Sequence, residues 1–172
     1  TSRIVRAAHQ INLGALPSLP GPGETSDFYM LPVEEPEEIA QTVVDLVMTR
    51  LPRKFDVDPL RDIQVLCPMN RSVTGARAIN QALQAALNPP GDHSVEKFGS
   101  AFSVGDKVMQ IENNYDREVY NGDIGFVAEN DREEDELVAE FDGRLVRYPF
   151  GELDELVLCY ATTIHKSQGS EY

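Results

Sequence analysis

Groups able to bind a ligand are concentrated in one short segment of the sequence, residues 161–172. The segment contains hydroxyl, imidazole, ammonium, amide and carboxylate groups, and it follows the apolar run 156–161, which predicts a buried strand. Ligands of open α/β sheets bind at the carboxyl ends of strands, so a buried strand followed by a polar segment indicates a binding site. An ordinary solvated loop after a strand explains the same composition equally well.

Length and composition indicate a globular protein. The 172 residues, 41% of them hydrophobic, suffice for one ordinary domain or two small ones. Because the apolar runs are far shorter than a membrane span and no amino-terminal signal pattern is present, we expect a cytoplasmic protein without membrane contact. Cys67 and Cys159 lie in separate apolar runs without a CxxC or histidine partner, which favours buried free thiols.

The net charge of −14 opposes nucleic-acid binding, because a domain that binds nucleic acid by itself normally has a basic face. Two explanations would reconcile this charge with binding. The acidic side chains, which are densest between Glu129 and Asp142, lie away from the site, or most phosphate contacts come from another part of a longer protein.

Helical and strand patterns alternate in the first half of the chain. The patterns predict a helix after Thr1 and Ser2, a loop over 17–23, a strand over 28–31, a helix from Pro36 to about Leu51, a strand over 63–67 and a helix over 73–87. Such alternation is typical of a parallel-sheet α/β unit.

The turn at 70–75 separates the strand over 63–67 from the helix that follows it. It places free backbone N–H groups, a hydroxyl cap, Arg71 and Gly75 at a helix N-terminus, and this arrangement predicts an anion site. An ordinary capped helix is the simpler interpretation of the same residues.

Short β patterns replace the helical ones after Lys97. They cover 106–111, 124–128, 137–141 and 144–148, with a long loop over 112–123 and a short turn at 150–153. This order is typical of a small SH3-like barrel. In the long loop, Asn113, Asn114 and Tyr115 are candidates for hydrogen bonding to or stacking on a nucleic-acid strand, although Tyr115 fits equally well as a side chain packed within the loop.

Residues 163–172, Thr-Ile-His-Lys-Ser-Gln-Gly-Ser-Glu-Tyr, resemble motif V of superfamily 1 helicases in the form found in RecD-like DNA helicases, also called exodeoxyribonuclease V alpha subunits. Three other stretches, 2–14, 65–89 and 105–125, resemble the same family in the same order. The resemblance implies an α/β fold in which a partial RecA-like parallel-sheet domain carries an inserted SH3-like β-barrel. The domain boundaries we predict are 1–92 and 154–172 for the RecA-like parts and 93–153 for the barrel.

The resemblance also implies roles for single residues, because motif V lies where single-stranded DNA meets the ATP cleft. The residues implied in DNA binding are Thr163, His165 and Lys166, together with Asn70, Arg71 and Gly75 in the turn that the DNA path crosses. On the nucleotide side are Gly169 and Glu171, and Gln168 between the two sets is implied in coupling.

The function implied by the family is that of a motor fragment of an ATP-dependent 5′–3′ DNA helicase acting in DNA recombination and repair. Implied cofactors of the parent protein are ATP and Mg²⁺, and implied partners are single-stranded DNA, a first RecA-like domain of the same protein and other subunits of a recombination nuclease complex. The sequence lacks a GxxxxGK[ST] loop, a strand-borne acidic pair and a motif VI arginine. We therefore expect no catalytic residue and no metal site in these 172 residues, no tightly bound cofactor, and no ATPase activity of this chain alone.

Two other functions are alternatives for the same sequence. A non-catalytic module could recruit a protein partner through the SH3-like barrel on an α/β base, but the sequence has no Trp for a polyproline groove. A nuclease would need a compact carboxylate cluster at a strand end, and the sequence shows none.

Overall fold

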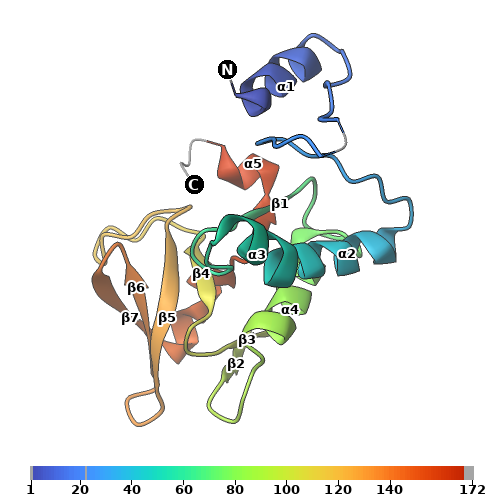
Figure 1. Ribbon diagram of the computed structural model, residues 1–172. Coiled ribbons are helices and arrows are strands. Elements are labelled where there is room, and N and C mark those ends of the chain that lie inside the picture. The colour runs from blue at the N-terminus through green and yellow to red at the C-terminus, as the bar shows by residue number, and fades with distance from the viewer. Residues whose placement is uncertain (1, 22, 169–172) are drawn as a thin grey trace. The chain divides into compact units, whose positions relative to one another are not determined.

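The computed structural model describes residues 2–21 and 23–168 (Figure 1). The chain divides into two compact units, Thr1–Glu34 and Glu35–Tyr172. This division lies inside the predicted first domain, and the predicted domain boundaries stay a prediction.

The first unit contains helix α1, Arg3–Asn12, which confirms the helix predicted at the amino-terminal end. Ser2 is its N-cap and accepts a hydrogen bond from the backbone N–H of Val5. The strand predicted over 28–31 was wrong. Ser26 explains the difference, because its hydroxyl accepts from the N–H of Phe28 and donates to the carbonyl of Phe28, so these backbone groups serve a local turn instead of a sheet.

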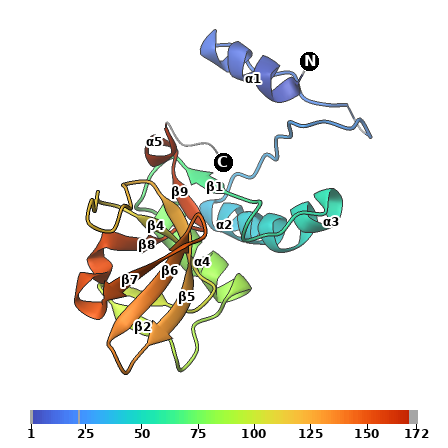
Figure 2. The ribbon, with the colours of Figure 1, turned by 90° about the vertical axis from the view of Figure 1, so that its left-hand side faces the viewer.

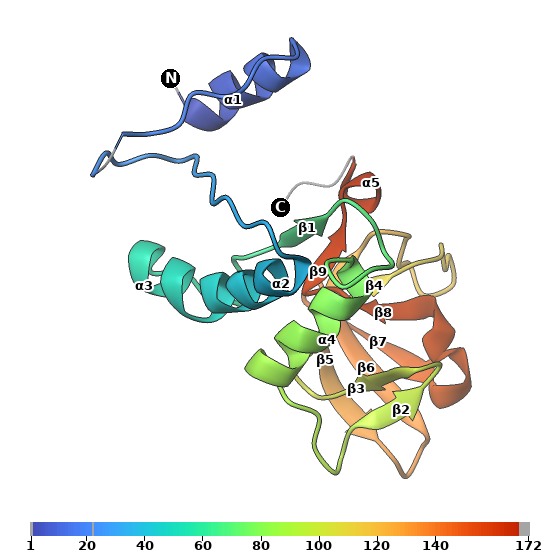
Figure 3. The same ribbon diagram turned by 90° about the vertical axis from the view of Figure 1, so that its right-hand side faces the viewer.

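The second unit begins with three consecutive helical segments that form one rod (Figure 3). They are α2, Pro36–Asp45, the π-helical turn η1, Leu46–Arg50, and α3, Leu51–Phe55. The wide turn ends two residues before Pro52, whose ring excludes an ordinary helical hydrogen bond and crowds the preceding turn. The predicted helix is confirmed and continues four residues beyond Leu51, to Phe55.

A parallel strand pair follows. Strand β1, Val65–Cys67, pairs with β9, Ala161–Thr163, in a register that sets Cys67 opposite Thr163. Helix α4, Ala76–Leu87, packs against β9, and the short helix α5, Ile164–Ser167, follows β9 directly. Both strands therefore end at the same edge, where the sequence placed the candidate residues.

The remaining strands form an antiparallel sheet of five strands in the order β7-β6-β5-β4-β8 (Figure 2). Their bounds are Lys107–Gln110 for β4, Ile124–Asp131 for β5, Glu136–Phe141 for β6, Arg144–Pro149 for β7 and Leu156–Leu158 for β8, with the 3₁₀ segment η2, Phe150–Glu155, between the last two. An unpredicted hairpin of β2, Val95–Lys97, and β3, Ser100–Phe102, precedes the sheet. The α/β class is confirmed.

The apolar run 156–161 forms two strands instead of the single strand that its composition predicted. β8 pairs antiparallel with β4, whereas β9 pairs parallel with β1, and two residues, Cys159 and Tyr160, connect them. The N–H of Cys159 donates to the carbonyl of Lys107, while the carbonyl of Tyr160 accepts from the N–H of Val65. The chain thus leaves one sheet and enters another within two residues, a change of partner that hydrophobicity alone does not encode.

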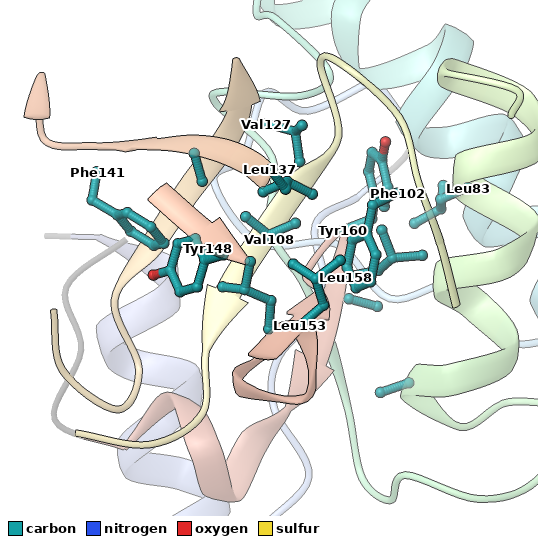
Figure 4. Close-up of a cluster of buried hydrophobic side chains, with 14 of the residues drawn as sticks. Leu83, Phe102, Val108, Val127, Leu137, Phe141, Tyr148, Leu153, Leu158 and Tyr160 are labelled. Atoms are coloured by element: carbon teal, nitrogen blue, oxygen red, sulfur yellow. The ribbon is translucent and has the colours of Figure 1, made fainter. Parts of the chain in front are cut away.

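One hydrophobic core runs from the inner face of the antiparallel sheet to α4 (Figure 4). Phe102, Leu158 and Tyr160 lie between the sheet and Leu83 of α4. Leu83 is completely buried and Phe102 is 1% exposed. The α/β part and the sheet therefore share their packing.

A buried carboxylate connects the antiparallel sheet to the α/β part by hydrogen bonds. Asp106, fully buried before β4, accepts hydrogen bonds from Gln84 of α4, from Asn88 at the C-cap of that helix, from the backbone of Ser103 and from the hydroxyl of Tyr160, at donor–acceptor distances of 2.6 to 2.7 Å. Burial raises the pKa of Asp106, and the four donors oppose this by stabilising the charged form. The four donors come from three separate segments, which are the end of α4, the residues before β4 and the β8–β9 connection.

Asn80 of α4 holds strand β9 on the side opposite β1. Its side-chain amide donates to the carbonyl of Ala161 at 2.7 Å and accepts from the N–H of Ala161 at 2.8 Å. The amide therefore replaces a neighbouring strand at this position, and it is only 7% exposed.

We predict that Asn80→Leu lowers the free energy of unfolding by about 2 to 4 kcal/mol, because both backbone groups of Ala161 lose their buried partner. Urea unfolding followed by circular dichroism measures this change. The control is Gln81→Leu, which alters the next, exposed residue of the same helix and should cost less than about 0.5 kcal/mol. Equal effects of the two substitutions would contradict the role given to Asn80.

We also predict that stability falls as the pH rises from about 9 to 11. Burial raises the pKa of the Cys159 thiol from 9.0 to about 11, and it raises the pKa of Tyr148 and Tyr160 as well. The unfolded chain therefore releases these protons at lower pH than the folded chain, so their contribution is complete below pH 9 and is lost above it. In urea unfolding at a series of pH values, Cys159→Ala should make the fall shallower by up to about 1.4 kcal/mol per pH unit. Parallel curves for the two proteins would refute this.

Candidate functional site

A groove of about 900 Å³ lies at the carboxyl edge of β1 and β9. Its walls come from the start of α4, the β2–β3 hairpin, the β8–β9 connection and α5. All of these elements belong to the second unit. The groove is the place where the strand-end residues predicted from the sequence meet residues from distant segments.

The structure brings together four of the six residues predicted to bind DNA. Lining the groove are Asn70, Thr163, His165 and Lys166. Arg71 and Gly75 belong to the same turn as Asn70 but do not line it. Gln168, which is exposed, follows the end of α5, and the nucleotide-side candidates Gly169 and Glu171 lie outside the described residues.

Thr163 is positioned by its backbone and by a capping bond. It is the last residue of β9 and the N-cap of α5, and its hydroxyl oxygen accepts from the N–H of Lys166 at 3.2 Å. Since the oxygen is the acceptor, the hydroxyl hydrogen is left to donate elsewhere. The polar segment that the sequence suggested as a loop is thus a helical turn that aims His165 and Lys166 from the end of the strand.

The turn at 70–75 differs from the predicted anion site. The N-cap of α4 is Gly75, without a side-chain cap, so the predicted hydroxyl cap was wrong. The N–H groups predicted to be free are bound within the turn, where Gly75 donates to Ser72, Ala76 to Met69 and Arg77 to Asn70. The turn folds back on the helix and uses these donors, so anion binding here depends on side chains.

Gly75 makes this fold of the turn possible. A Cβ atom at Gly75 would lie 2.6 Å from the carbonyl oxygen of Asn70 and 2.9 Å from the carbonyl carbon of Arg71. Its φ of −78° is ordinary, so close approach of backbone, and not an unusual dihedral, requires glycine.

Two cations in the groove were missed by sequence reasoning. Arg77, in the first turn of α4, and Lys97, at the end of β2, line the groove together with Lys166. Glu96 is the single carboxylate among the described residues that line it. Arg77 follows the glycine turn by two residues and could have been found as a basic residue in the first helical turn, but the position of Lys97 depends on a hairpin that was not predicted.

The acidic residues are on other elements. None of those between Glu129 and Asp142 lines the groove in the part of the chain that the structure describes, since they belong to β5, β6 and their connections. The groove is therefore cationic on a chain of net charge −14. The first of the two explanations for the acidic composition agrees with this arrangement.

The loop candidates in the barrel-like part are used largely by the loop itself. Asn114 donates to Glu155, and Asn113 accepts from the N–H of Asn121. Tyr115 packs edge-on against Tyr120, with ring centroids 5.9 Å apart. Tyr115 nevertheless remains 73% exposed.

The described residues contain no group of three or more His, Cys, Asp or Glu side chains arranged to hold a metal ion. Both cysteines are buried and unpaired. Among the described helices, none combines the length and apolarity needed to span a bilayer.

We predict that Gly75→Ala distorts the 70–75 turn and lowers the free energy of unfolding by at least about 1 kcal/mol, because backbone atoms cannot move aside as a flexible side chain can. Thermal unfolding measures the effect. Gly91→Ala is the control, since a Cβ there has no atom within 4 Å and the residue has no positive φ. A Gly75→Ala protein as stable as the control would show that the turn is not constrained in this way.

Helicases are among the solved structures and the curated proteins that are similar to this chain. A structure of Bacteroides Pif1 helicase in complex with ADP-AlF3 and ssDNA has 18% sequence identity and a TM-score of 0.44, covering 83% of this chain and 43% of that one. Unliganded Pif1 from Bacteroides sp. is similar at 18% identity and a TM-score of 0.43, with the same coverage.

Curated sequences are more similar. The ATP-dependent RecD2 DNA helicase of Deinococcus radiodurans is 40% identical over 112 residues, which are 64% of this chain and 15% of that protein. The RecBCD enzyme subunit RecD of Mycolicibacterium smegmatis is 30% identical over 112 residues, 65% of this chain and 19% of that protein. The chain thus spans less than a fifth of the length of these two relatives.

A family model described as the SH3 domain of ATP-dependent RecD-like DNA helicases matches residues 79–141. The matched segment begins within α4 and ends at the last residue of β6, so it includes the β2–β3 hairpin and most of the antiparallel sheet. Residues 79–141 therefore match the SH3 domain family of RecD-like DNA helicases, and the resemblance of the chain to these proteins is confirmed.

Proposed function

We propose that the chain is part of the motor of an ATP-dependent DNA helicase that moves 5′ to 3′, and that its groove holds single-stranded DNA. The observation that carries this proposal is the grouping of Arg77, Lys97 and Lys166 around one groove of an acidic chain. The similarity to RecD2 and RecD supports the helicase class. Because the chain spans only a small part of these relatives, activity is proposed for the full-length protein.

The groove offers the two kinds of contact that a DNA backbone requires. Exposed ammonium and guanidinium groups neutralise phosphates and release their counterions, which supplies most of the affinity. The hydroxyl of Thr163 and the amide of Asn70 can donate to phosphate oxygens without a charge of their own. In this proposal Lys166 is a phosphate contact, and Thr163, His165 and Asn70 fix the register of the strand.

Arg71 and Gly75 act differently from the residues that line the groove. Gly75 permits the close turn that presents Asn70, so its role in DNA binding is indirect. Arg71 is exposed beside the groove, where its long side chain suits a flanking phosphate.

The nucleotide side is proposed from the resemblance. Gly169 and Glu171 contact ATP, with Mg²⁺ held elsewhere in the full-length protein, and Gln168 couples the nucleotide to the DNA. The position of Gln168 supports this role, because it follows α5 directly after the groove residues His165 and Lys166. A first RecA-like domain of the same protein completes the ATP cleft, and other subunits of a recombination nuclease complex are candidate partners.

Charge distribution would also guide the strand. A cationic groove on a chain with net charge −14 attracts a polyanion at one place and repels it from acidic elements such as the β5–β6 connection. Such an arrangement limits non-specific binding elsewhere on the surface.

We predict that Lys166→Ala and Lys97→Ala in the full-length protein each weaken binding to oligo(dT) and reduce the slope of log K against log salt concentration by about 0.7, as expected for one phosphate contact on a single strand. Fluorescence anisotropy at several salt concentrations gives both quantities. Lys54→Ala removes the same charge from α3, away from the groove, and should leave the slope unchanged.

Identical slopes for the Lys166→Ala, Lys97→Ala and unaltered proteins would remove the groove from the DNA path.

The direction of movement along DNA is measured separately, with the same full-length protein. Duplexes with a 5′ single-stranded tail should be unwound in the presence of ATP and Mg²⁺, and unwinding of 3′-tailed duplexes alone would contradict the proposed polarity.

A further inference from the structure

The β2–β3 hairpin turns through two residues that both have positive φ. Lys97 pairs with Ser100, and the two residues between them, Phe98 and Gly99, have φ values of 50° and 78°. A two-residue turn of this kind favours Asn or Gly at its first position, because residues with a bulky side chain rarely adopt a left-handed backbone. Phenylalanine at this position opposes the backbone preference of the turn.

Phe98 stands out among the strained positions of the chain. The other non-glycine residues with positive φ in the described part are Asp56, Ser72, Glu118, Asp135 and Asp142, which are all polar. Phe98 is the aromatic exception, and its side chain is 64% exposed. Packing of the Phe98 ring within the protein therefore does not offset the cost of its strained backbone. This points to a ligand as the reason for a phenylalanine at this position.

The base of the hairpin is held from both sides. Asn130 of β5 donates to the carbonyls of His93 and Phe102, and Arg132 donates to those of Asp92 and Ser94. On the other side, Gln84 of α4 donates to the carbonyl of Ala101 at 2.8 Å. With its base fixed to the sheet and to α4, the hairpin presents Phe98 at a defined position in the groove wall.

The surroundings of Phe98 determine which ligand suits it. Phe98 lines the groove between Lys97 and Gly99, and a Cβ atom on Gly99 would lie 3.6 Å from a guanidinium nitrogen of Arg77. An exposed aromatic ring flanked by cations matches a single-stranded nucleic acid, whose phosphates pair with the cations while a base stacks on the ring. A purely apolar partner would leave these cations unpaired.

We propose that Phe98 is a stacking platform for one nucleobase of the strand in the groove, with Arg77 and Lys97 on the flanking phosphates. This inference rests on the proposed function, because it assigns a base contact within the same groove. Every base has a π-face, so the contact adds affinity at one position of the strand without selecting a sequence. The strained turn fixes the ring in the groove before the strand binds.

The test measures the affinity of the full-length protein for oligo(dT) and for a set of oligonucleotides that each contain one abasic nucleotide at a different position. For the unaltered protein, one abasic position should weaken binding about 5- to 100-fold, as expected for the loss of one stacked base. Phe98→Ala should weaken binding to intact oligo(dT) by a similar factor and should be insensitive to that abasic position. Phe98→Trp should restore both the affinity and the sensitivity.

Phe98→Asn separates binding from stability. Asn suits the turn, so this variant should melt about 2 to 4 °C higher than the unaltered protein while binding oligo(dT) as weakly as Phe98→Ala. A structural role for the ring would instead make both variants less stable. Lower melting temperatures together with unchanged affinity would overturn the proposal.

The outcomes also separate this inference from the proposed function. Unchanged salt slopes for Lys166→Ala and Lys97→Ala would reject the groove as a DNA site, and the platform with it. Reduced slopes, combined with the same abasic profile for Phe98→Ala and the unaltered protein, would reject the platform alone.

Discussion

The carboxylate of Asp106 is the interaction on which the arrangement of the second unit depends. A charged group taken out of water must recover its hydration from the protein, and Asp106 does so with four donors that come from α4, the β3–β4 turn and the β8–β9 connection. Of these segments, α4 and the β8–β9 connection also line the groove. Partial satisfaction would leave a buried charge without enough donors, so the segments are held together or released together. Asn80 adds a second, neutral link between α4 and β9.

These buried hydrogen bonds determine the geometry with which the segments pack more than they add to the strength of the packing. Leu83, Phe102 and Tyr160 could pack in several similar ways, because apolar contacts are not directional. The hydrogen bonds of Asp106 and Asn80 accept far fewer geometries. The groove is formed by strands of three sheets and by α4 and α5, and these hydrogen bonds fix the positions of α4 and β9 within it, which reduces the entropy that binding must overcome.

Local sequence patterns predict most of the helices and strands. They do not predict where the chain passes from one sheet to another. Periodicity identified α1, the α2 rod, β1, α4 and the strands from β4 to β7. The resemblance of residues 163–172 to motif V pointed to Thr163, His165 and Lys166, which line the groove. The same periodicity merged β8 with β9, because Leu156 to Ala161 are apolar whichever sheet they join. The β2–β3 hairpin was not predicted because its strands have only three residues each and include two charged residues, and because Phe98 occupies a turn position that favours Asn. Arg77 and Lys97 could not be assigned to a site until that hairpin was placed.

The two-residue connection between β8 and β9 has a mechanical consequence. An extended residue spans at most about 3.5 Å, so Cys159 and Tyr160 contain no slack, and both are anchored by backbone hydrogen bonds to opposite sheets. Movement of the antiparallel sheet therefore displaces β9, because no flexible loop between β8 and β9 can absorb it. The first residues that this displacement meets are Thr163 and the short helix that carries His165 and Lys166. Movement of the antiparallel sheet is thereby transmitted directly to the end of β9, and movement of that strand end is transmitted to the sheet.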